Sequence, residues 1–344
     1  MRIITTTLAL LSPLLPVMAQ QDATPTASPF VRRAVVEEYT GTWCGNCPRG
    51  IVGLQRLAEE FGDRCIPIAV HTSTGSGEPM QISAYPDLQP GSGIPACTID
   101  RGPKLDPYRG SSEEFHCNII DDFARRLAEP TEAALELTAA WDDDSQWDVR
   151  FHAATTFNIS SADAPYRLAF ILTEDGLKGT GKAWAQVNYY SAAAGYSDSG
   201  TFLDDDMKWW RDAPYYVTDM EYDHVPVNTL GIKSGIQGSI RSPIVSGEQQ
   251  DYSNTVTTIN KDVIQDKSRL SAVAILLNTT TGRIVNAAKA DIQPYGAAAI
   301  PSVDDGRHAM PHAASDIQGR RLLTHPSSLR KGIYILNGKK IFIK

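Results

Sequence analysis

Two cysteines separated by two residues, in Trp43-Cys44-Gly45-Asn46-Cys47-Pro48, are the part of this sequence best suited to chemistry. They directly follow a strand-like run and directly precede a helix-like run. The free N–H groups and the dipole at a helix start favour a thiolate at the first cysteine. That thiolate can attack a disulfide in another molecule, and the second thiol can then release the mixed disulfide. The motif therefore predicts thiol–disulfide exchange, with Cys44 as nucleophile and Cys47 as resolving thiol.

Zinc binding is the main alternative, because zinc sites use the same Cys-x-x-Cys spacing. A zinc site would need a second ligand pair. The sequence has no other Cys-x-x-Cys. No His-x(3–5)-His pair follows Cys47 at the zinc-finger spacing of about 12–15 residues. The acidic runs 142–144 and 204–206 lack the alternating spacing of a calcium loop and are interpreted as solvated turns. No metal or cofactor site is therefore predicted.

Three further residues extend the motif. Trp43 directly precedes the first cysteine, Glu38 lies six residues before Cys44, and Pro95 lies about fifty residues downstream, just before a second strand-like run. Together these residues resemble the thioredoxin family. The resemblance implies that Glu38 is a buried proton acceptor and that Pro95 is a cis-proline facing the disulfide on the substrate side. The Gly-Asn dipeptide and a Glu in place of the commoner Asp depart from the family pattern, which leaves the redox potential open.

A β/α alternation surrounds these residues, as expected for an α/β thioredoxin-like domain at 33–130. The predicted strands lie at 34–39, 65–70 and 96–100, with a weaker one within 101–109. The predicted helices lie near 46–61, as one turn around 80–86, and from the capping box at Ser111–Glu114 to Pro130.

After Pro130 the pattern changes to strands. Strict alternation over 149–159, a strand at 166–173 and a hairpin over 271–290 predict an all-β antiparallel sandwich domain at 131–292. Four aromatic residues of this part are interpreted as sandwich core, with an exposed binding platform as the alternative; they are Trp209, Trp210, Tyr215 and Tyr216.

Three more cysteines lie in the first third of the chain, namely Cys65, Cys97 and Cys117. Cys65, at a strand start, and Cys117, expected within a helix, are interpreted as small buried residues. A Cys97–Cys117 disulfide is the alternative, because a helix could pack over that strand. The odd total of five leaves at least one thiol free, unless it pairs between molecules.

The two ends of the chain predict export. Residues 1–19 combine Arg2, a short apolar core and small residues before position 20, which is typical of a cleaved secretory signal. A polar lead-in follows at 20–32. Residues 293–314 resemble a linker, and the basic, strand-like residues 315–344 predict either a docked C-terminal β-hairpin or a tail similar to type IX sorting signals.

The formal charge of −8 and the lack of a basic cluster in the two domains argue against nucleic-acid binding. The order of export signal, segment 37–48 and long β-rich second half is similar to a family related to a 28-kilodalton outer-membrane protein of Gram-negative anaerobes. That resemblance covers residues 33–292 and implies a periplasmic, outer-membrane or surface location, including peripheral association with the membrane.

Two functions follow from these features. The first is a cell-envelope thiol–disulfide oxidoreductase whose partners are protein thiols and disulfides. The second is a non-catalytic surface binding or structural protein, in which Cys44–Cys47 is a permanent staple on a thioredoxin-like scaffold. The sequence leaves the direction of electron flow, the substrate, the electron donor and the oligomeric state open.

Overall fold

The structure, a computed structural model of the whole chain, describes residues 30–73, 77–194, 205–258, 263–296, 314–316, 321–322, 332–336 and 339–343. The predicted signal peptide, most of the lead-in and most of the linker lie outside these residues. No helix in the described part of the chain is both long enough and apolar enough to cross a membrane.

The first sheet has four strands and carries two helices. Its elements are β1 (Ala34–Thr40), α1 (Pro48–Phe61), β2 (Cys65–His71), β3 (Ala96–Ile99), β4 (Lys104–Leu105) and α2 (Ile119–Ala128). The strand order is β2-β1-β3-β4; β1 is parallel to β2 and antiparallel to β3, and β4 is antiparallel to β3. The three predicted strands and the first helix are present, and the weakly predicted fourth strand is only two residues long.

Helix α1 is bounded by local signals that the sequence shows. Pro48 is its first residue, where a missing N–H loses no helical hydrogen bond. Gly62 follows its last residue with a φ of 53°, a left-handed conformation that glycine adopts without strain. Between them Leu54 and Leu57 are buried in a cluster that includes Val36 of β1. The apolar face of α1 therefore fixes the helix against the sheet.

The second helix begins later than predicted, at Ile119 rather than at Ser111. Ser111 does not act as a helix cap: its backbone N–H and its hydroxyl donate to the Asp122 carboxylate at 2.6 and 2.9 Å. The ring of Phe115 packs against the ring of Tyr108. These tertiary contacts override the local capping signal, which reflects only a weak preference.

Two other predictions for this part are wrong. The helical turn expected around 80–86 is absent; this stretch forms non-helical turns, and its side chains Met80 and Tyr85 are buried in two different apolar clusters. Cys117 precedes α2 instead of lying within it, and Cys65, Cys97 and Cys117 are all free, so no Cys97–Cys117 disulfide forms.

The second half of the chain forms a seven-stranded sheet. Its strands are β5 (Ala133–Trp141), β6 (Asp148–Phe157), β7 (Tyr166–Glu174), β10 (Val225–Leu230), β11 (Gln249–Thr257), β12 (Leu270–Asn278) and β13 (Ile284–Gln293). The order is β10-β7-β12-β13-β5-β6-β11. The predicted hairpin is β12–β13. The prediction of a purely antiparallel sandwich needs correction, because one sheet connects all seven strands and the last two residues of β13 pair in parallel with β5.

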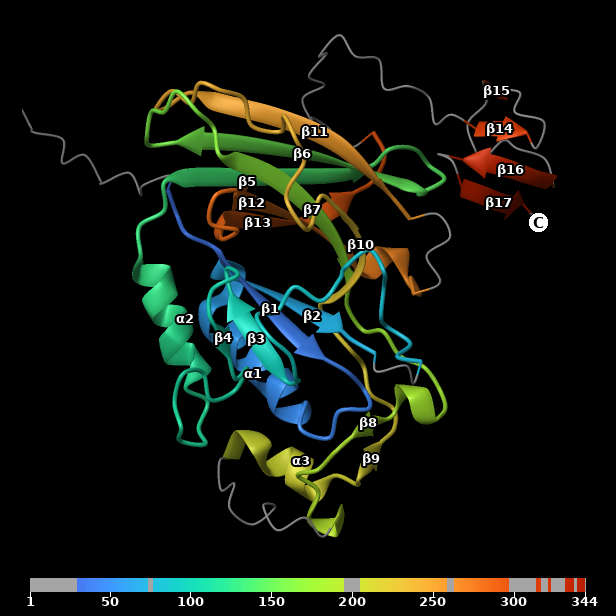
Figure 1. Cartoon of the computed structure of the whole chain (residues 1–344). Helices are drawn as coiled ribbons and strands as arrows, with labels where there is room; N and C mark the ends of the chain where they lie inside the picture. The colour runs from blue at the N-terminus through green and yellow to red at the C-terminus, as the bar shows by residue number, and fades with distance from the viewer. Residues whose placement is uncertain are drawn as a thin grey trace, which may run out of the picture.

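This sheet curves into two layers, with β5, β6 and β11 above β7, β12 and β13 in Figure 1. Large side chains from both layers, among them Phe151 and Phe170, form the core between them. The opposite face of β7 and β12 packs on the first sheet, since Ile171 and Val273 share a cluster with Val35 and Ile68. The first sheet is therefore enclosed by the helices on one face and by the second sheet on the other.

A small unit within the second half contacts the first sheet's helix rather than the sandwich core. It contains β8 (Gln186–Val187), α3 (Lys208–Asp212) and β9 (Tyr216–Val217), and lies at the bottom of Figure 1. Trp210 is buried in a cluster with Val52 of α1, whereas Trp209 and Tyr216 are 57% and 42% exposed. The interpretation of these aromatic residues as sandwich core is therefore wrong, and the second half is not all-β.

Residues near the two ends are also ordered into the fold. Arg32, assigned to the loose lead-in, is only 6% exposed; its guanidinium lies 3.5 Å from the Asp100 carboxylate and donates to the carbonyl of Val285 at 3.0 Å. It therefore joins the first sheet to the second.

The tail forms a further four-stranded sheet in the order β15-β14-β16-β17. The strands are β14 (Ala314–Asp316), β15 (Arg321–Leu322), β16 (Gly332–Leu336) and β17 (Lys339–Ile343). The predicted hairpin is present as the antiparallel pair β16–β17, and its predicted turn at Asn337-Gly338 lies outside the described residues.

Candidate functional site

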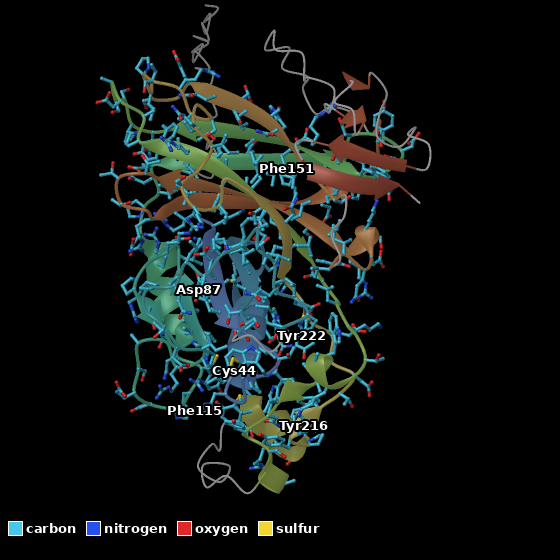
Figure 2. All side chains as sticks on the ribbon, turned by 45° about the vertical axis from the view of Figure 1, so that its right-hand side comes forward. Cys44, Asp87, Phe115, Phe151, Tyr216 and Tyr222 are labelled. Carbon is cyan, nitrogen blue, oxygen red and sulfur yellow. A yellow bond between two sulfur atoms is a disulfide. The ribbon has the colours of Figure 1, made fainter. Side chains whose placement is uncertain are left out.

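The two cysteines of the motif form a disulfide at the start of α1. Cys47 is the residue before the first helical turn, and the Cα atoms of Cys44 and Cys47 are 5.3 Å apart. Cys44 is 6% exposed and Cys47 is fully buried. The sulfur pair therefore lies at the N-terminal end of α1 and is almost fully buried; Figure 2 labels Cys44 within the first domain.

The loop before the helix is held by its own backbone. Cys44 N–H donates to the carbonyl of Gly41, and Cys47 N–H donates to the carbonyl of Cys44, both at 3.1 Å. The indole N–H of Trp43 donates to the carbonyl of Thr72 at 2.9 Å, which ties the loop to the chain after β2. Trp43 is thus a structural anchor of the motif in this structure.

Glu38 lies beneath the first turn of α1. It is 1% exposed, and its Oε1 has no hydrogen-bond partner in the described part of the chain. A Cβ at Gly50 would overlap Oε1 of Glu38, so this glycine lets the helix approach the carboxyl group. Burial raises the pKa of Glu38 to about 8, and the Thr40 hydroxyl and the Arg49 guanidinium oppose that rise.

A small cavity of about 50 Å³ adjoins Glu38. It lies between the first sheet and the second half of the chain, and its lining includes Thr40, His71, Tyr222 and His224. This volume has room for water, which needs about 10–15 Å³. The cavity therefore offers a path along which the Glu38 carboxyl group could exchange a proton with solvent.

A buried hydrogen-bonded pair supports the loop from the β2 side. His71 Nδ1 lies 3.0 Å from Oε1 of Glu78, and both side chains are almost fully buried. The other carboxylate oxygen of Glu78 accepts hydrogen bonds from the Thr42 N–H and hydroxyl at 2.8 and 3.0 Å. Glu78, held by His71, therefore fixes Thr42, the residue two places before Cys44.

Pro95 lies at the same end of the first sheet as the disulfide. The Ile94–Pro95 peptide bond is cis, and Pro95 is buried directly before β3. The next residue, Ala96, pairs with Tyr39 of β1, which leads into the motif. The two cysteines and Pro95 thus lie at one end of the first sheet, the end towards which β1, the strand that carries Glu38, runs.

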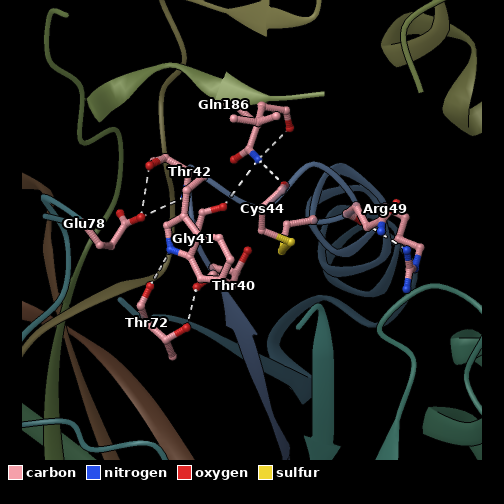
Figure 3. Close-up of a disulfide and its surroundings, with 12 residues drawn as sticks. Thr40, Gly41, Thr42, Cys44, Arg49, Thr72, Glu78 and Gln186 are labelled. Carbon is pink, nitrogen blue, oxygen red and sulfur yellow. Dashed lines mark hydrogen bonds between the residues drawn. A yellow bond between two sulfur atoms is a disulfide. The ribbon is translucent and has the colours of Figure 1, made fainter. Parts of the chain in front are cut away.

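The segment Gln186–Tyr190 also contacts the motif, and sequence reasoning did not identify it. Gln186 Nε2 donates to the carbonyl of Cys44 at 2.9 Å, as Figure 3 shows, and Val187 N–H donates to the carbonyl of Thr42 at 2.8 Å. Tyr189 N–H donates to the carbonyl of Gly45 at 2.9 Å. The aromatic density of 184–190 was the only sequence signal for this segment.

An ion pair extends this contact along α1. Arg49 donates to the Asp106 carboxylate at 2.9 Å and to the Tyr190 hydroxyl at 2.9 Å. Asp106 holds its own loop by accepting hydrogen bonds from the N–H groups of Tyr108 and Arg109, both at 3.0 Å.

Among the described residues, no group of three or more His, Cys, Asp or Glu side chains is arranged to hold a metal ion.

Comparison with known proteins gives a structural relationship without a sequence relationship. No protein-family model and no curated relative matches the chain. HBP35 of Porphyromonas gingivalis is structurally similar over 91% of this chain and 98% of its own, with a TM-score of 0.50 and 15% identity. At that identity the similarity shows a shared overall fold.

Two further solved structures are more distant. A protein from Agrobacterium tumefaciens covers 78% of this chain and 98% of its own, with a TM-score of 0.39 and 11% identity. A domain of the outer membrane lipoprotein Omp28 from Porphyromonas gingivalis covers 48% of this chain and 90% of its own, with a TM-score of 0.24 and 11% identity. Scores this low support no conclusion about the present chain.

Proposed function

We propose that this protein is a cell-envelope thiol–disulfide oxidoreductase whose first sheet and helices form a thioredoxin-like domain. The observation that carries the proposal is a disulfide at the start of a helix whose first turn covers the buried carboxyl group of Glu38, which forms no ion pair with any described residue. The strand order β2-β1-β3-β4 and the proline before β3 also agree with it. Perturbed, buried ionisable groups of this kind are concentrated at functional sites.

In the reducing direction, the Cys44 thiolate attacks one sulfur of a substrate disulfide. The substrate S–S bond breaks, a mixed disulfide with Cys44 forms, and one substrate thiolate leaves and takes a proton from water. Cys47 then gives its proton to the Glu38 carboxylate and attacks the Cys44 sulfur. The Cys44–Cys47 bond forms, the second substrate thiolate leaves, and two electrons have passed from the protein to the substrate.

Glu38 suits the role of proton acceptor because its affinity for a proton is close to that of a thiol. Burial raises the Glu38 pKa to about 8, while an ordinary cysteine has a pKa of about 8.5. Transfer between groups of similar pKa is nearly balanced in free energy, which favours proton transfer in either direction. The adjoining cavity would let the carboxyl group return its proton to solvent between turnovers.

Pro95 is proposed to form the substrate side of the site. Proline lacks an N–H, so this edge of β3 offers a substrate peptide a carbonyl without a competing donor. The loop before it, Gly91–Gly93, is exposed and could admit an extended segment that flanks the target disulfide. The proposed substrates are therefore disulfides in polypeptides.

The envelope location is part of the same proposal. It is supported by the secretory signal predicted at 1–19 and by the sequence resemblance over 33–292. An exported protein would meet protein thiols and disulfides in the oxidising compartment where disulfides persist.

The catalytic assignment is tested by Cys44→Ser in an insulin-reduction assay driven by dithiothreitol. We expect loss of activity to background, because Ser cannot form the mixed disulfide. Cys117→Ser is the matched control: it removes a thiol from the same part of the chain and leaves the Cys44–Cys47 pair in place. Unchanged activity in Cys44→Ser would contradict the proposed function.

One observation favours the alternative of a non-catalytic surface protein. The disulfide is nearly inaccessible, with Cys44 only 6% exposed, as expected of a staple. The two functions differ in reduction potential: a structural bridge lies below about −300 mV, whereas catalytic pairs lie at about −120 to −270 mV.

A further inference from the structure

The side chain of Gln186 contacts the same carbonyl groups that shape the redox loop. Its Nε2 donates to the carbonyl of Cys44 at 2.9 Å and lies 3.4 Å from the carbonyl of Gly41. These two carbonyls also accept the backbone N–H groups of Cys47 and Cys44, respectively. Gln186 is buried and comes from β8, more than a hundred residues away in sequence (Figure 3). A single amide group thus bridges two turns: the turn Gly41–Cys44, which leads into the motif, and the turn Cys44–Cys47, which separates the two cysteines.

The residues after Gln186 continue this contact over the loop. Val187 and Tyr189 donate their backbone N–H groups to the carbonyls of Thr42 and Gly45 at 2.8 and 2.9 Å. The Tyr189 ring lies so close over Gly45 that a Cβ at this position would overlap it. We call residues 186–190 the strap. The Tyr190 hydroxyl also donates to the carbonyl of Asn46, at 3.4 Å. Hydrogen bonds from four strap residues and the Tyr189 ring therefore hold the loop from outside.

The strap is itself held in place. Asn188 Nδ2 donates to the carbonyl of Trp210 at 2.7 Å, and the Asn188 N–H donates to the carbonyl of Tyr215 at 2.8 Å. Tyr190 is buried in a cluster with Trp210 and with Val52 of α1. The strap is therefore a fixed support and not a freely moving loop end.

We propose that the strap is a redox-coupled clamp, which stabilises the disulfide form of the Cys44–Cys47 pair relative to the dithiol form. Reduction adds two electrons and two protons, breaks the S–S bond and forces the sulfur atoms apart to van der Waals distance. In this proposal the loop Cys44–Cys47 takes up the larger sulfur separation. The carbonyls of Cys44 and Gly45 in this loop accept the hydrogen bonds of the strap, so a change in the loop disturbs them. Gln186 is thus a positioning residue for the exchange reaction, and this inference rests on the proposed function.

The docking of the strap and the formation of the disulfide are two coupled equilibria, and their coupling has a measurable consequence. If a docked strap favours the disulfide, then the disulfide favours a docked strap by the same factor. Reduction should loosen the strap, and removal of its contacts should make the disulfide easier to reduce. The second half of the chain would thereby report, and adjust, the redox state of the first.

The test is the thiol–disulfide equilibrium of Gln186→Leu in glutathione buffers, read by alkylation and mass spectrometry of Cys44 and Cys47. We expect a shift towards the dithiol of up to about tenfold, which is equivalent to about 30 mV for a two-electron couple. Gln265→Leu is the matched control, because that amide donates to the carbonyl of Lys178, far from the motif. A shift equal to that of the control would overturn the clamp.

A second measurement uses the unmodified protein and so does not depend on how the variant folds. Hydrogen exchange of the Val187 and Tyr189 amides is compared before and after reduction. The clamp predicts faster exchange in the dithiol form; equal exchange in both forms would overturn it. Because neither measurement uses turnover, an inactive protein with a strap-dependent equilibrium would contradict the proposed function alone, whereas an active protein with an unaffected equilibrium would contradict the clamp alone.

Discussion

Glu37 and Glu38 are adjacent on β1 and equally buried, at 1% exposure each, yet their surroundings are opposite. Side chains alternate along a strand, so the two carboxyl groups point to different faces of the first sheet. Glu37 lies on the face that meets the second sheet, and Glu38 lies on the face beneath α1. The same residue type at the same depth therefore serves two different purposes.

Glu37 is fully partnered. Its carboxylate accepts the Arg101 guanidinium at 3.2 Å, the Tyr85 hydroxyl at 2.6 Å and the Thr98 hydroxyl at 3.3 Å. Tyr85 comes from the segment after β2 and Arg101 from the segment after β3, whereas Thr98 lies in β3 itself, so the carboxylate fastens two loops to the centre of the sheet. A buried charge with this set of partners is a structural tie.

Among the described residues, no arginine or lysine lies within ion-pair distance of Glu38, and one of its carboxyl oxygens has no hydrogen-bond partner. Its pKa of about 8 lies where a carboxyl group can gain and lose a proton near neutral pH. The comparison teaches that burial alone does not mark a functional acid in this protein. What distinguishes Glu38 from Glu37 is that no described residue supplies a counter-charge to it beneath the first turn of α1.

The largest effect that the comparison predicts is from Glu37→Gln. This change removes the charge opposite Arg101, which is itself 11% exposed, and leaves a buried guanidinium without its counter-ion. We expect the free energy of unfolding to fall by about 3–5 kcal/mol. Urea denaturation of the oxidised protein measures it. A loss below about 1 kcal/mol would show that Glu37 is not a tie.

Glu38→Gln should instead change how stability depends on pH. The folded-state pKa of Glu38 is raised, so the stability it contributes is full below the ordinary pKa of about 4.3 and is lost as pH rises through about 8. Gln does not titrate. Between pH 5 and pH 8 the free energy of unfolding of the variant should therefore rise relative to that of the wild type, by at most about 1.4 kcal/mol per pH unit.

The measurement is urea denaturation of both proteins, with the disulfide intact, at each pH. Glu37→Gln is the matched control and should keep the wild-type pH slope, since it leaves Glu38 in place. Parallel curves for Glu38→Gln and wild type would mean that Glu38 has the same pKa in the folded and unfolded protein. A carboxylate with an ordinary pKa of about 4.3 would be too weak a base to take a proton from a thiol, so this result would remove Glu38 as proton acceptor.

The smallest predicted effects are those of two Tyr→Phe changes, and Tyr85→Phe is the first. The change deletes one hydrogen bond to the Glu37 carboxylate and keeps the ring, so a loss of about 1.5–3 kcal/mol is expected for a charged acceptor. Tyr222→Phe is the comparison, because its hydroxyl donates to the neutral carbonyl of Trp184 at 2.9 Å and should cost about 0.5–1.5 kcal/mol. Equal losses would indicate that Glu37 is not charged.

The sequence was sufficient for the elements that depend on local pattern. The apolar runs of β1 and β2, the Pro48 start and the Gly62 end of α1 are all written in consecutive residues, and the structure has them. The burial of Glu38 follows from its place in the first of these strands. Its lack of a counter-charge could not be predicted, because Arg49 and Arg101 each lie at almost the same sequence distance from Glu37 as from Glu38.

The features that failed depend on contacts between distant residues. The capping box at Ser111 has the right residues, but Asp122 binds that serine and the helix starts later. The strap was missed because nothing local marks Gln186 as a partner of Cys44. The parallel pairing of β13 with β5 joins residues more than a hundred positions apart and leaves no periodic signal.

The central claim is tested most directly by a redox titration of the mature protein against defined thiol buffers, with alkylation and peptide mass spectrometry reading each cysteine. The account predicts that Cys44 and Cys47 interconvert as a pair at about −120 to −270 mV, while Cys65, Cys97 and Cys117 remain thiols. A pair that stays oxidised below about −300 mV would contradict it and identify the disulfide as a staple.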